Sequence, residues 1–343
     1  MSSTRKLSAL HREVLAKRGL PPINEDGTNV ATGQSYRSTP STSRGSRRAP
    51  AVDLSPLGWH EFFDQKLELN INDGVFCVYT KGNAGPIFYM LHGGGYSGLT
   101  WAPLAEQLSL HVKCRVVAPD LRGHGNTTTE DDLNLSTERQ VEDILAIHKK
   151  ICENEAIPTF MIGHSMGGAL AVHVTASGRI ENVVGLAVID VVEGTAMEAL
   201  KTMKQFLKNR PQKFGSIGAA VEWCYKSGTA KNARAARVSM PSQIKKNGDL
   251  YTWRIDLSKT EPHWVGWFQG LSNLFLSCHA PKLLVLAGID RLDTDLIVGQ
   301  MQGKFQETIL PKAGHAVQED SPEELANTLA TFAIRNRFCQ TLN

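Results

Sequence analysis

The stretch that decides the fold runs Pro-Thr-Phe-Met-Ile-Gly-His-Ser-Met-Gly-Gly-Ala-Leu-Ala-Val, from Pro158 to Val172. Its apolar run, residues 160–162, is typical of a buried strand, and small residues with helical spacing follow soon after. Between them, residues 163–167 form a Gly-x-Ser-x-Gly motif, which presents a nucleophilic serine when a strand precedes it and a helix follows. A chance Gly-Ser turn is the alternative, but the flanking strand and helix favour the nucleophile.

Ser165 stands at the apex of this turn. Glycines on both sides let the chain pass close to its neighbours without a Cβ clash, so the hydroxyl is pushed out at the carboxyl end of the strand. The amide of Met166 opens the helix, where the helix dipole favours negative charge. We therefore expect Ser165 to be the nucleophile and Met166 to donate one hydrogen bond to an oxyanion.

Composition and charge narrow the classes of function. The chain has 343 residues, 41% of them hydrophobic, and its net charge is only +3, which predicts no nucleic-acid partner. No apolar run approaches the ~20 residues that a membrane helix needs, and the first residues lack the apolar core of a signal peptide. The six cysteines are scattered without a Cys-x-x-Cys pair. This pattern predicts reduced thiols in an intracellular protein, cytoplasmic or nuclear, with no metal and no cofactor.

The first fifty residues differ in composition from the rest. They are rich in Ser, Thr, Arg and Gly, and they hold nine basic and three acidic residues, a net charge of +6. Such a segment buries too little apolar surface to fold alone. We expect a disordered basic tail over residues 1–50, either simply solvated or serving nuclear import or phosphorylation, and a folded domain over residues 51–343.

Apolar segments alternate with helical patterns along that domain. The patterns predict strands at 66–71, 75–80, 87–91, 115–118, 160–162, 183–189, 282–287 and 305–310, and helices at 101–110, at 137–151 and from 321 onward. The segment 72–74, Asn-Asp-Gly, predicts a hairpin turn between the first two strands. This alternation predicts a mostly parallel sheet flanked by helices, the α/β class of the α/β-hydrolase type, with its active site at the carboxyl ends of the strands.

A run of three glycines follows the strand at 87–91, in the segment His-Gly-Gly-Gly-Tyr-Ser at 92–97. Consecutive glycines let the backbone approach a ligand and aim amides at it, and esterases place a second oxyanion donor after this strand. We assign that donor to Gly94, with Gly95 as the alternative. His124, in a later loop, is interpreted as a packing and hydrogen-bonding residue.

A serine hydroxyl needs a base, and the base needs an orienting carboxylate. His315 follows the last predicted strand and stands downstream of the serine, in the chain order that this fold uses. Two acids lie at strand ends, Asp190 and Asp290. Because most hydrolases of this fold carry the acid after the penultimate strand, position alone favours Asp290.

Several segments resemble protein phosphatase methylesterase. They are Met-Leu-His-Gly-Gly-Gly at 90–95, Gly-His-Ser-Met-Gly-Gly at 163–168, Val-Ile-Asp-Val-Val-Glu-Gly-Thr-Ala-Met at 188–197, Tyr-Thr-Trp-Arg at 251–254, Ala-Gly-Ile-Asp-Arg-Leu-Asp at 287–293 and Gly-Gln-Met-Gln-Gly-Lys-Phe at 299–305. The resemblance covers the chain from about residue 50 onward. It implies an esterase that removes the methyl group from the C-terminal leucine of the protein phosphatase 2A catalytic subunit. It also implies that the acid is Asp190, which leaves Asp290 as the alternative.

Residues 194–279 are interpreted as a cap inserted over the site. This segment holds four of the six tryptophans, with thirteen basic and five acidic residues, a net charge of +8. A basic cap over a neutral ester favours an acidic or carboxylate-bearing partner surface. We expect Trp253, Arg254 and Trp264 to contact the substrate. Members of the resembled family can carry a long acidic loop before Tyr-Thr-Trp-Arg, whereas only residues 244–250 stand there in this chain.

Two other functions fit parts of this pattern. A small-molecule esterase or lipase of the same fold would use the same three catalytic groups. A module that binds the phosphatase without chemistry would need none of them. The basic insertion and the narrow motifs argue against the first, and the intact serine, histidine and acid argue against the second.

Overall fold

A mixed sheet forms the centre of the structure, a computed structural model that describes residues 52–153, 155–288 and 292–341. The expected basic tail, residues 1–50, lies outside the described residues. The strands of the sheet follow the order β1-β2-β4-β3-β6-β7-β11-β12, and β5 pairs with β2. Their bounds are β1 Gln65–Ile71, β2 Gly74–Lys81, β3 Ile87–Leu91, β4 Arg115–Pro119, β5 Thr128–Thr129, β6 Thr159–His164, β7 Val183–Ile189, β11 Lys282–Leu286 and β12 Gln306–Ile309.

Most of this sheet is parallel. β1 and β2 form an antiparallel hairpin in which Ile71 pairs with Gly74, so the expected turn is present, and Asn72 adopts a left-handed φ of 49° within it. β2 also runs antiparallel to β4, whereas the pairs β4–β3, β3–β6, β6–β7, β7–β11 and β11–β12 are all parallel. The expected α/β class with a mostly parallel sheet is therefore confirmed.

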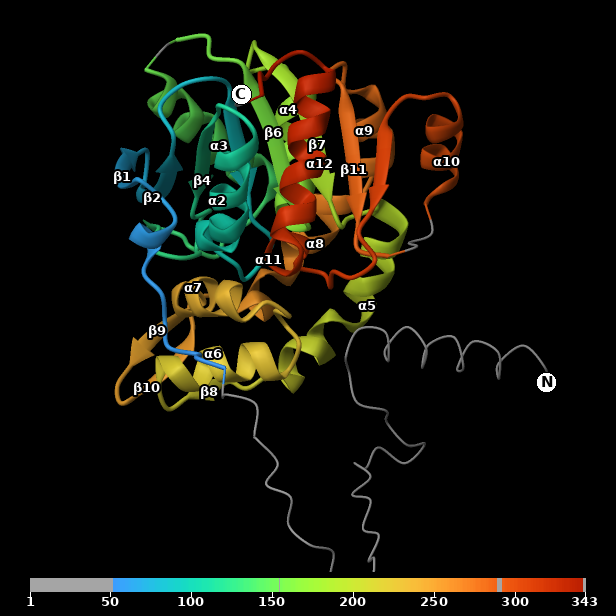
Figure 1. Ribbon diagram of the computed structural model, residues 1–343. Coiled ribbons are helices and arrows are strands. Elements are labelled where there is room, and N and C mark those ends of the chain that lie inside the picture. The colour runs from blue at the N-terminus through green and yellow to red at the C-terminus, as the bar shows by residue number, and fades with distance from the viewer. Residues whose placement is uncertain (1–51, 154, 289–291, 342–343) are drawn as a thin grey trace, which may run out of the picture. The chain divides into compact units, whose positions relative to one another are not determined.

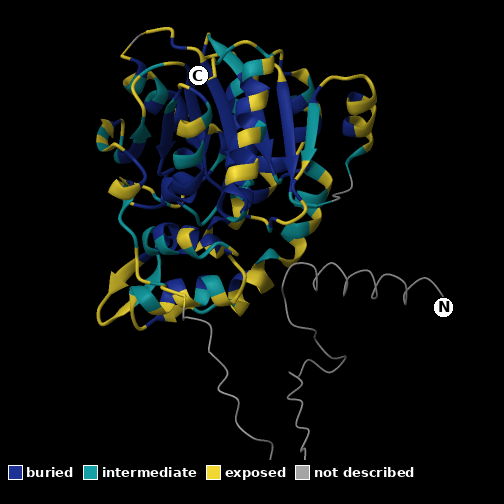
Figure 2. Cartoon of the chain, viewed as in Figure 1, coloured by how far each residue is buried: buried dark blue, intermediate teal, exposed yellow. Residues whose placement is uncertain are grey.

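Helices cover both faces of the sheet (Figure 1). α2 (Ala102–His111) and α12 (Pro322–Arg335) pack together on one face. α3 (Thr137–Cys152) and α4 (Met166–Ala176) pack together on the other, with α9 (Leu271–Ser277) against α4. Figure 2 shows the central strands of the main sheet buried and exposed residues on the outer sides of these helices. The sheet is thus the middle of three layers.

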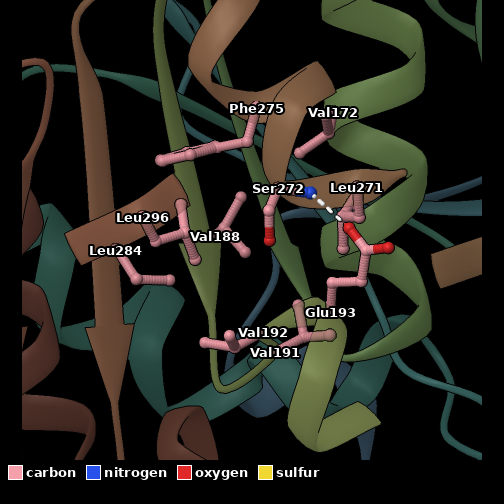
Figure 3. Close-up of a pocket in the computed structure, with 10 residues that line it drawn as sticks. All are labelled: Val172, Val188, Val191, Val192, Glu193, Leu271, Ser272, Phe275, Leu284 and Leu296. Carbon is pink, nitrogen blue, oxygen red and sulfur yellow. Dashed lines mark hydrogen bonds between the residues drawn. The ribbon is translucent and has the colours of Figure 1, made fainter. Parts of the chain in front are cut away.

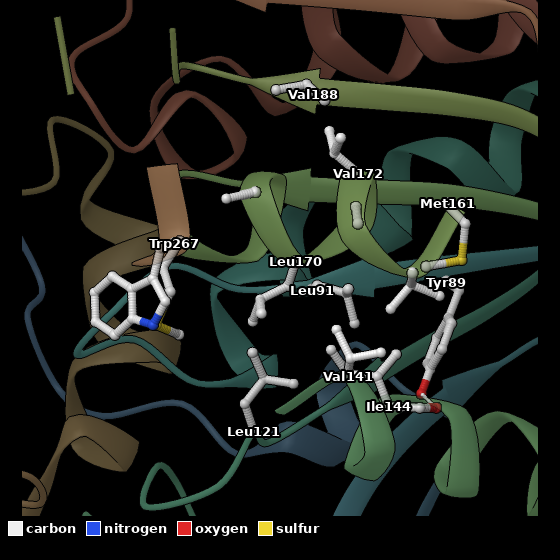
Figure 4. Close-up of a cluster of buried hydrophobic side chains, with 14 of the residues drawn as sticks. Tyr89, Leu91, Leu121, Val141, Ile144, Met161, Leu170, Val172, Val188 and Trp267 are labelled. Atoms are coloured by element: carbon white, nitrogen blue, oxygen red, sulfur yellow. Dashed lines mark hydrogen bonds between the residues drawn. The ribbon is translucent and has the colours of Figure 1, made fainter. Parts of the chain in front are cut away.

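Side chains of the central strands alternate between two separate hydrophobic cores. On β3, Phe88 and Met90 join the core beneath α2 and α12, whereas Tyr89 and Leu91 join the core beneath α3 and α4. Successive side chains of a strand point to opposite faces, so a strand buried on both faces must be apolar throughout. Figure 4 shows part of the second core, in which Tyr89 also donates its hydroxyl to the carbonyl of Ile144 at 2.9 Å.

The chain between β7 and β11 forms an insertion, residues 190–281, which we call the β7–β11 insertion. Its elements are α5 Glu193–Asn209, β8 Lys213–Phe214, α6 Ile217–Lys226, α7 Ala233–Gln243, β9 Ile244–Asn247, β10 Leu250–Trp253, η3 Leu257–Thr260, α8 Glu261–Phe268 and α9. Strands β8, β10 and β9 make a second, three-stranded sheet that the sequence patterns did not predict. With α6 and α7 this sheet encloses a core of its own, and in Figure 1 these elements lie beyond one end of the main sheet.

The six cysteines all fall among the described residues and are free thiols. Within the described ranges, no helix is long and apolar enough to cross a membrane.

Candidate active site

The turn that carries Ser165 joins β6 to α4. Ser165 has φ 53° and ψ −121°, a left-handed backbone that a non-glycine residue rarely adopts. A Cβ at Gly163 would lie 2.1 Å from the carbonyl oxygen of Gly167, and a Cβ at Gly167 would lie 2.2 Å from that of Leu91. Both glycines of the motif are therefore required by close backbone approach. The Ser165 amide donates to the carbonyl of Ile189 at 3.0 Å, so the turn abuts the end of β7.

Asp190 stands at that end of β7 and also has a left-handed backbone, with φ 52°. Its Oδ2 lies 2.6 Å from Nδ1 of His315, and its Oδ1 accepts from the amide of Ala287 at 2.9 Å. Burial alone would raise the pKa of Asp190, but the hydrogen bond and the charge of His315 hold that pKa below its ordinary value. The side chain of Asp190 is 10% exposed. Asp290 lies outside the described residues.

His315 lies in the loop between β12 and α11 (Val317–Asp320). Because Nδ1 faces the Asp190 carboxylate, the ring proton belongs on Nδ1, which leaves Nε2 free to accept a proton. The carbonyl of His315 lies 2.7 Å from Nε2 of the buried His164, and the two rings are 4.7 Å apart. Among the described residues, no hydrogen bond joins the Ser165 hydroxyl to His315. Bonds of this kind often tighten only when substrate binds.

The glycine run after β3 lies beside Ser165. A Cβ at Gly93 would lie 3.2 Å from that of Ser165, and one at Gly94 would lie 3.8 Å from Sδ of Met166. The Gly95 amide is already committed, because it donates to Nε2 of His124 at 2.9 Å. By contrast, the amides of Gly94 and Met166 make no hydrogen bond to any residue that the structure describes. These two donors therefore remain available next to the serine.

Buried histidines fix this glycine run, and the interpretation of His124 as a hydrogen-bonding residue agrees with its contacts. Nδ1 of His124 donates to the carbonyl of Arg122 at 2.8 Å, so its Nε2 is the acceptor for Gly95. Burial lowers the pKa of His124 to about 4, which keeps the ring neutral. His92 accepts from the amide of Leu121 at 2.9 Å and is equally buried. Neither His92 nor His164 was predicted to have a role, although His92 precedes the glycine run and His164 lies within the Gly-x-Ser-x-Gly motif.

The three expected substrate contacts occupy different surroundings. Trp253, on β10, packs edge-on against Phe214 and Trp223, and the Arg210 guanidinium lies 4.0 Å from its ring centre. Arg254 is half-buried and donates to the carbonyl of Thr127 at 3.2 Å. Trp264, on α8, is 4% exposed, and its Nε1 donates to Thr260 at 3.0 Å. Any action of Trp264 on substrate must therefore pass through the residues that it supports.

A small pocket is lined by residues other than the three candidate catalytic residues. Figure 3 shows it between α4, β7, β11, α9 and α10 (Thr294–Met301), lined mostly by aliphatic side chains. Glu193 stands at its edge, where its carboxylate accepts from the amides of Gly270 at 2.8 Å and Ser272 at 3.0 Å. The lining contains none of Ser165, Asp190 and His315, so this pocket is not part of their site.

Comparisons with known proteins agree with this geometry. The model of the alpha/beta hydrolase family matches residues 88–328. A probable protein phosphatase methylesterase 1 of Caenorhabditis elegans is 57% identical over 303 residues, which cover 88% of this chain and 82% of the relative. Protein phosphatase methylesterase 1 of Bos taurus is 41% identical, over 98% of this chain and 99% of the relative.

Solved structures support the same fold. E-2-(acetamidomethylene)succinate hydrolase superposes with a TM-score of 0.66 at 20% identity, covering 79% of this chain and 99% of that one. An esterase from Mycobacterium tuberculosis superposes with a TM-score of 0.60 at 22% identity, covering 78% and 90%. Identities this low bear on the fold alone. The family match and the two methylesterase relatives go further: this chain is a serine hydrolase that belongs to the protein phosphatase methylesterase family of the α/β-hydrolases.

Proposed function

We propose that this chain hydrolyses the methyl ester on the C-terminal leucine of the protein phosphatase 2A catalytic subunit. Membership of the methylesterase family supplies the class of substrate, because the two relatives above carry that name. The observation that carries the chemistry is the 2.6 Å contact between Asp190 and His315, next to the strained turn of Ser165. An acid, a base and a nucleophile at neighbouring strand ends are what ester hydrolysis requires.

The reaction proceeds through an acyl-enzyme. His315 Nε2 takes the proton of the Ser165 hydroxyl as its oxygen attacks the ester carbonyl, and a tetrahedral oxyanion forms. The oxyanion collapses, the bond to the methoxy oxygen breaks, and His315 returns the proton so that methanol leaves. Water, activated by the same imidazole, then attacks the acyl-enzyme and releases the leucine carboxylate. No step needs a metal or a cofactor.

Asp190 is the acid of this proposal. Its carboxylate faces Nδ1 of His315, sets the tautomer and stabilises the imidazolium that forms during attack. The lowered pKa of Asp190 keeps the carboxylate charged at neutral pH. Asp290, which position along the chain favoured, remains the alternative.

Met166 and Gly94 are the oxyanion donors of this proposal. Both amides lack a partner among the described residues, and Met166 begins α4, where the helix dipole adds positive potential. Gly95 is less suited because its amide already donates to His124 at 2.9 Å. Two such donors stabilise the charge that develops on the carbonyl oxygen.

The β7–β11 insertion is proposed to cap the site and to receive the phosphatase tail. Leu257 of η3 supports this, because its Cδ1 would lie 3.1 Å from a Cβ at Gly95. Trp253 and Arg254 precede this element, and Trp264 holds it through Thr260. The net charge of +8 over residues 194–279 suits an acidic partner surface. We propose that the reaction takes place inside the cell, in the cytoplasm or nucleus, in keeping with the six free cysteines.

Purified enzyme and a carboxymethylated phosphatase 2A catalytic subunit test this function. Loss of the leucine methyl ester is followed by mass spectrometry, and p-nitrophenyl acetate serves as a small ester in parallel. We expect kcat/KM for the phosphatase to exceed that for the small ester by orders of magnitude. Rapid turnover of small esters with none of the phosphatase would instead indicate a small-molecule esterase. Tight binding of the phosphatase without methyl loss would indicate a binding module.

A further inference from the structure

The loop that carries His315 is held by a second carboxylate, that of Asp320. Oδ2 of Asp320 accepts a hydrogen bond of 2.6 Å from the amide of Gly314, the residue before His315. The approach is close, since a Cβ at Gly314 would lie 2.9 Å from the same oxygen. Asp320 is the last residue of α11. The bond therefore closes a loop of residues 314–320 that contains His315.

The other oxygen of Asp320 reaches the β7–β11 insertion. Oδ1 accepts from the amide of Lys231 at 2.7 Å, and the Lys231 ammonium donates to the carbonyl of Lys312 at 3.0 Å. Lys231 lies between α6 and α7, more than eighty residues away in the chain. The Asp320 carboxylate therefore joins the His315 loop to the β7–β11 insertion. The Lys231 ammonium makes a second contact between the same two segments, through the Lys312 carbonyl.

A buried set of polar side chains holds the other end of the same loop. Nε2 of His164 faces the His315 carbonyl at 2.7 Å, and because burial lowers the pKa of His164 to about 3, a neutral ring must donate this bond. Gln318 donates to Thr100 at 2.9 Å, and Thr100 donates to Glu319 at 2.6 Å. Two backbone groups on either side of the His315 side chain are thus anchored, the Gly314 amide by Asp320 and the His315 carbonyl by His164.

Asp320 is also coupled electrostatically to His315. Burial raises the pKa of Asp320, while the amides of Lys231 and Gly314 and the charges of Lys231 and His315 oppose that rise. A positive charge on His315 thus favours the ionised form of the Asp320 carboxyl. The carboxylate of Asp190 contacts the ring directly, whereas Asp320 acts through the backbone and at longer range.

We propose that Asp320 is a positioning residue for His315, which fixes the base against Asp190 and joins it to the β7–β11 insertion. This inference rests on the proposed role of His315 as the base. It does not depend on which ester is the substrate. Misplacement of a catalytic group by about 1 Å can cost about a hundredfold in rate, so the loss of such an anchor is measurable.

The test uses the full-length chain with Asp320→Asn, Gly314→Ala and, as a matched control, Glu323→Gln on the exposed side of α12. Asparagine keeps the size of aspartate but turns an amide N–H toward one of the two backbone donors. Gly314→Ala removes no polar group and only pushes the carboxylate away. We expect both variants to lose about ten- to hundredfold in kcat on a small ester, with KM within about twofold. The control stays at the wild-type rate.

Two further readouts separate positioning from stability. The downfield proton resonance of the His315 Nδ1–H bond to Asp190 should shift or broaden in both variants, and Ser165 should react more slowly with a fluorophosphonate. A lower melting temperature with unchanged kcat, resonance and labelling would overturn the proposal. Should Asp320→Asn fail to fold, Gly314→Ala decides alone. Failure of the wild type to demethylate the phosphatase would leave this test intact, because no readout here uses that substrate.

Discussion

Asp190 Oδ2 and His315 Nδ1 lie 2.6 Å apart although 125 positions separate the two residues in the chain. Asp190 follows β7 and His315 follows β12, with β11 between these strands in the sheet. The second oxygen of Asp190 accepts from the amide of Ala287, just after β11. The Asp190 carboxylate is therefore held through Oδ1 by the residue after β11, and its Oδ2 faces His315.

Asp190→Asn should lower kcat by roughly 10⁴, the loss that the same change causes in a serine protease. Asparagine keeps an oxygen for Ala287 and turns an amide toward Nδ1, which forces the wrong tautomer on His315. Steady-state kinetics on a small ester measure the loss, and circular dichroism checks the fold. Asp290→Asn is the matched control and should retain most activity. A near-dead Asp290→Asn beside an active Asp190→Asn would reverse the assignment.

Gly95→Ala should reduce kcat at least tenfold, while the melting temperature falls by only a few degrees. Gly95 has φ +84°, where an L side chain is strained, and its Cβ would lie 3.1 Å from Leu257. Such strain costs about 1–3 kcal/mol and displaces the glycine run that carries the Gly94 amide. Kinetics on a small ester and a thermal melt measure the two effects. Full activity in this variant would show that the run tolerates displacement and is not an oxyanion site.

Glu319→Gln should stabilise the protein in a manner that depends on pH. Burial raises the pKa of Glu319 from 4.5 to about 7, so the folded state favours the protonated acid. Below pH 4.5 both states bind the proton and no cost arises. As pH rises to 7 and beyond, ionisation of Glu319 lowers the free energy of unfolding of the wild type by up to about 3 kcal/mol. The glutamine variant has no such loss.

Urea denaturation of both proteins between pH 4.5 and 8 measures this difference. We expect the free energies of unfolding to be similar at pH 4.5 and to diverge as pH rises, with the variant the more stable. A difference that stays constant across this range would mean that Glu319 does not titrate there.

Lys204→Glu should raise KM for the methylated phosphatase several-fold and leave KM for a small ester unchanged. Lys204, on α5 of the insertion, lies 2.5 Å from Glu261, but because both side chains are exposed the pair contributes only about 0–1 kcal/mol, so the reversal costs the fold little. Wild-type association should also weaken with salt, because exposed charges are screened beyond ~10 Å at 0.1 M. Lys149→Glu, on α3 and outside the insertion, is the control. Equal effects on both substrates would mean that Lys204 only solvates the surface.

The sequence predicted the parts of the fold that rest on local patterns. The β6–turn–α4 unit and the strands β3 and β7 follow from apolar runs that end in turn residues, and these runs are buried as expected. The small sheet of β8, β9 and β10 escaped prediction because its strands are two to four residues long and only β8 and β9 each bury one residue. Their pairing depends on contacts between segments far apart in the chain.

The site was predictable in its residue types more than in its geometry. Asp190 and Asp290 each follow a segment predicted as a strand, and position along the chain favoured Asp290, whereas the resemblance to methylesterases pointed to Asp190. The roles of His164 and Asp320 arise from bonds to backbone groups of the His315 loop, and no sequence motif records such bonds. The choice of Gly94 over Gly95 likewise depends on one hydrogen bond from a distant loop.

Hydrolysis of the methylated phosphatase in ¹⁸O-labelled water tests the central claim most directly. Attack by Ser165 on the ester carbonyl, followed by water, places one labelled oxygen in the C-terminal leucine carboxylate and leaves methanol unlabelled. We predict this outcome for the wild type, and no methyl loss with Ser165→Ala, whose fold should be intact. Demethylation by Ser165→Ala at the wild-type rate, or label in methanol instead of the carboxylate, would contradict a serine esterase acting on this ester.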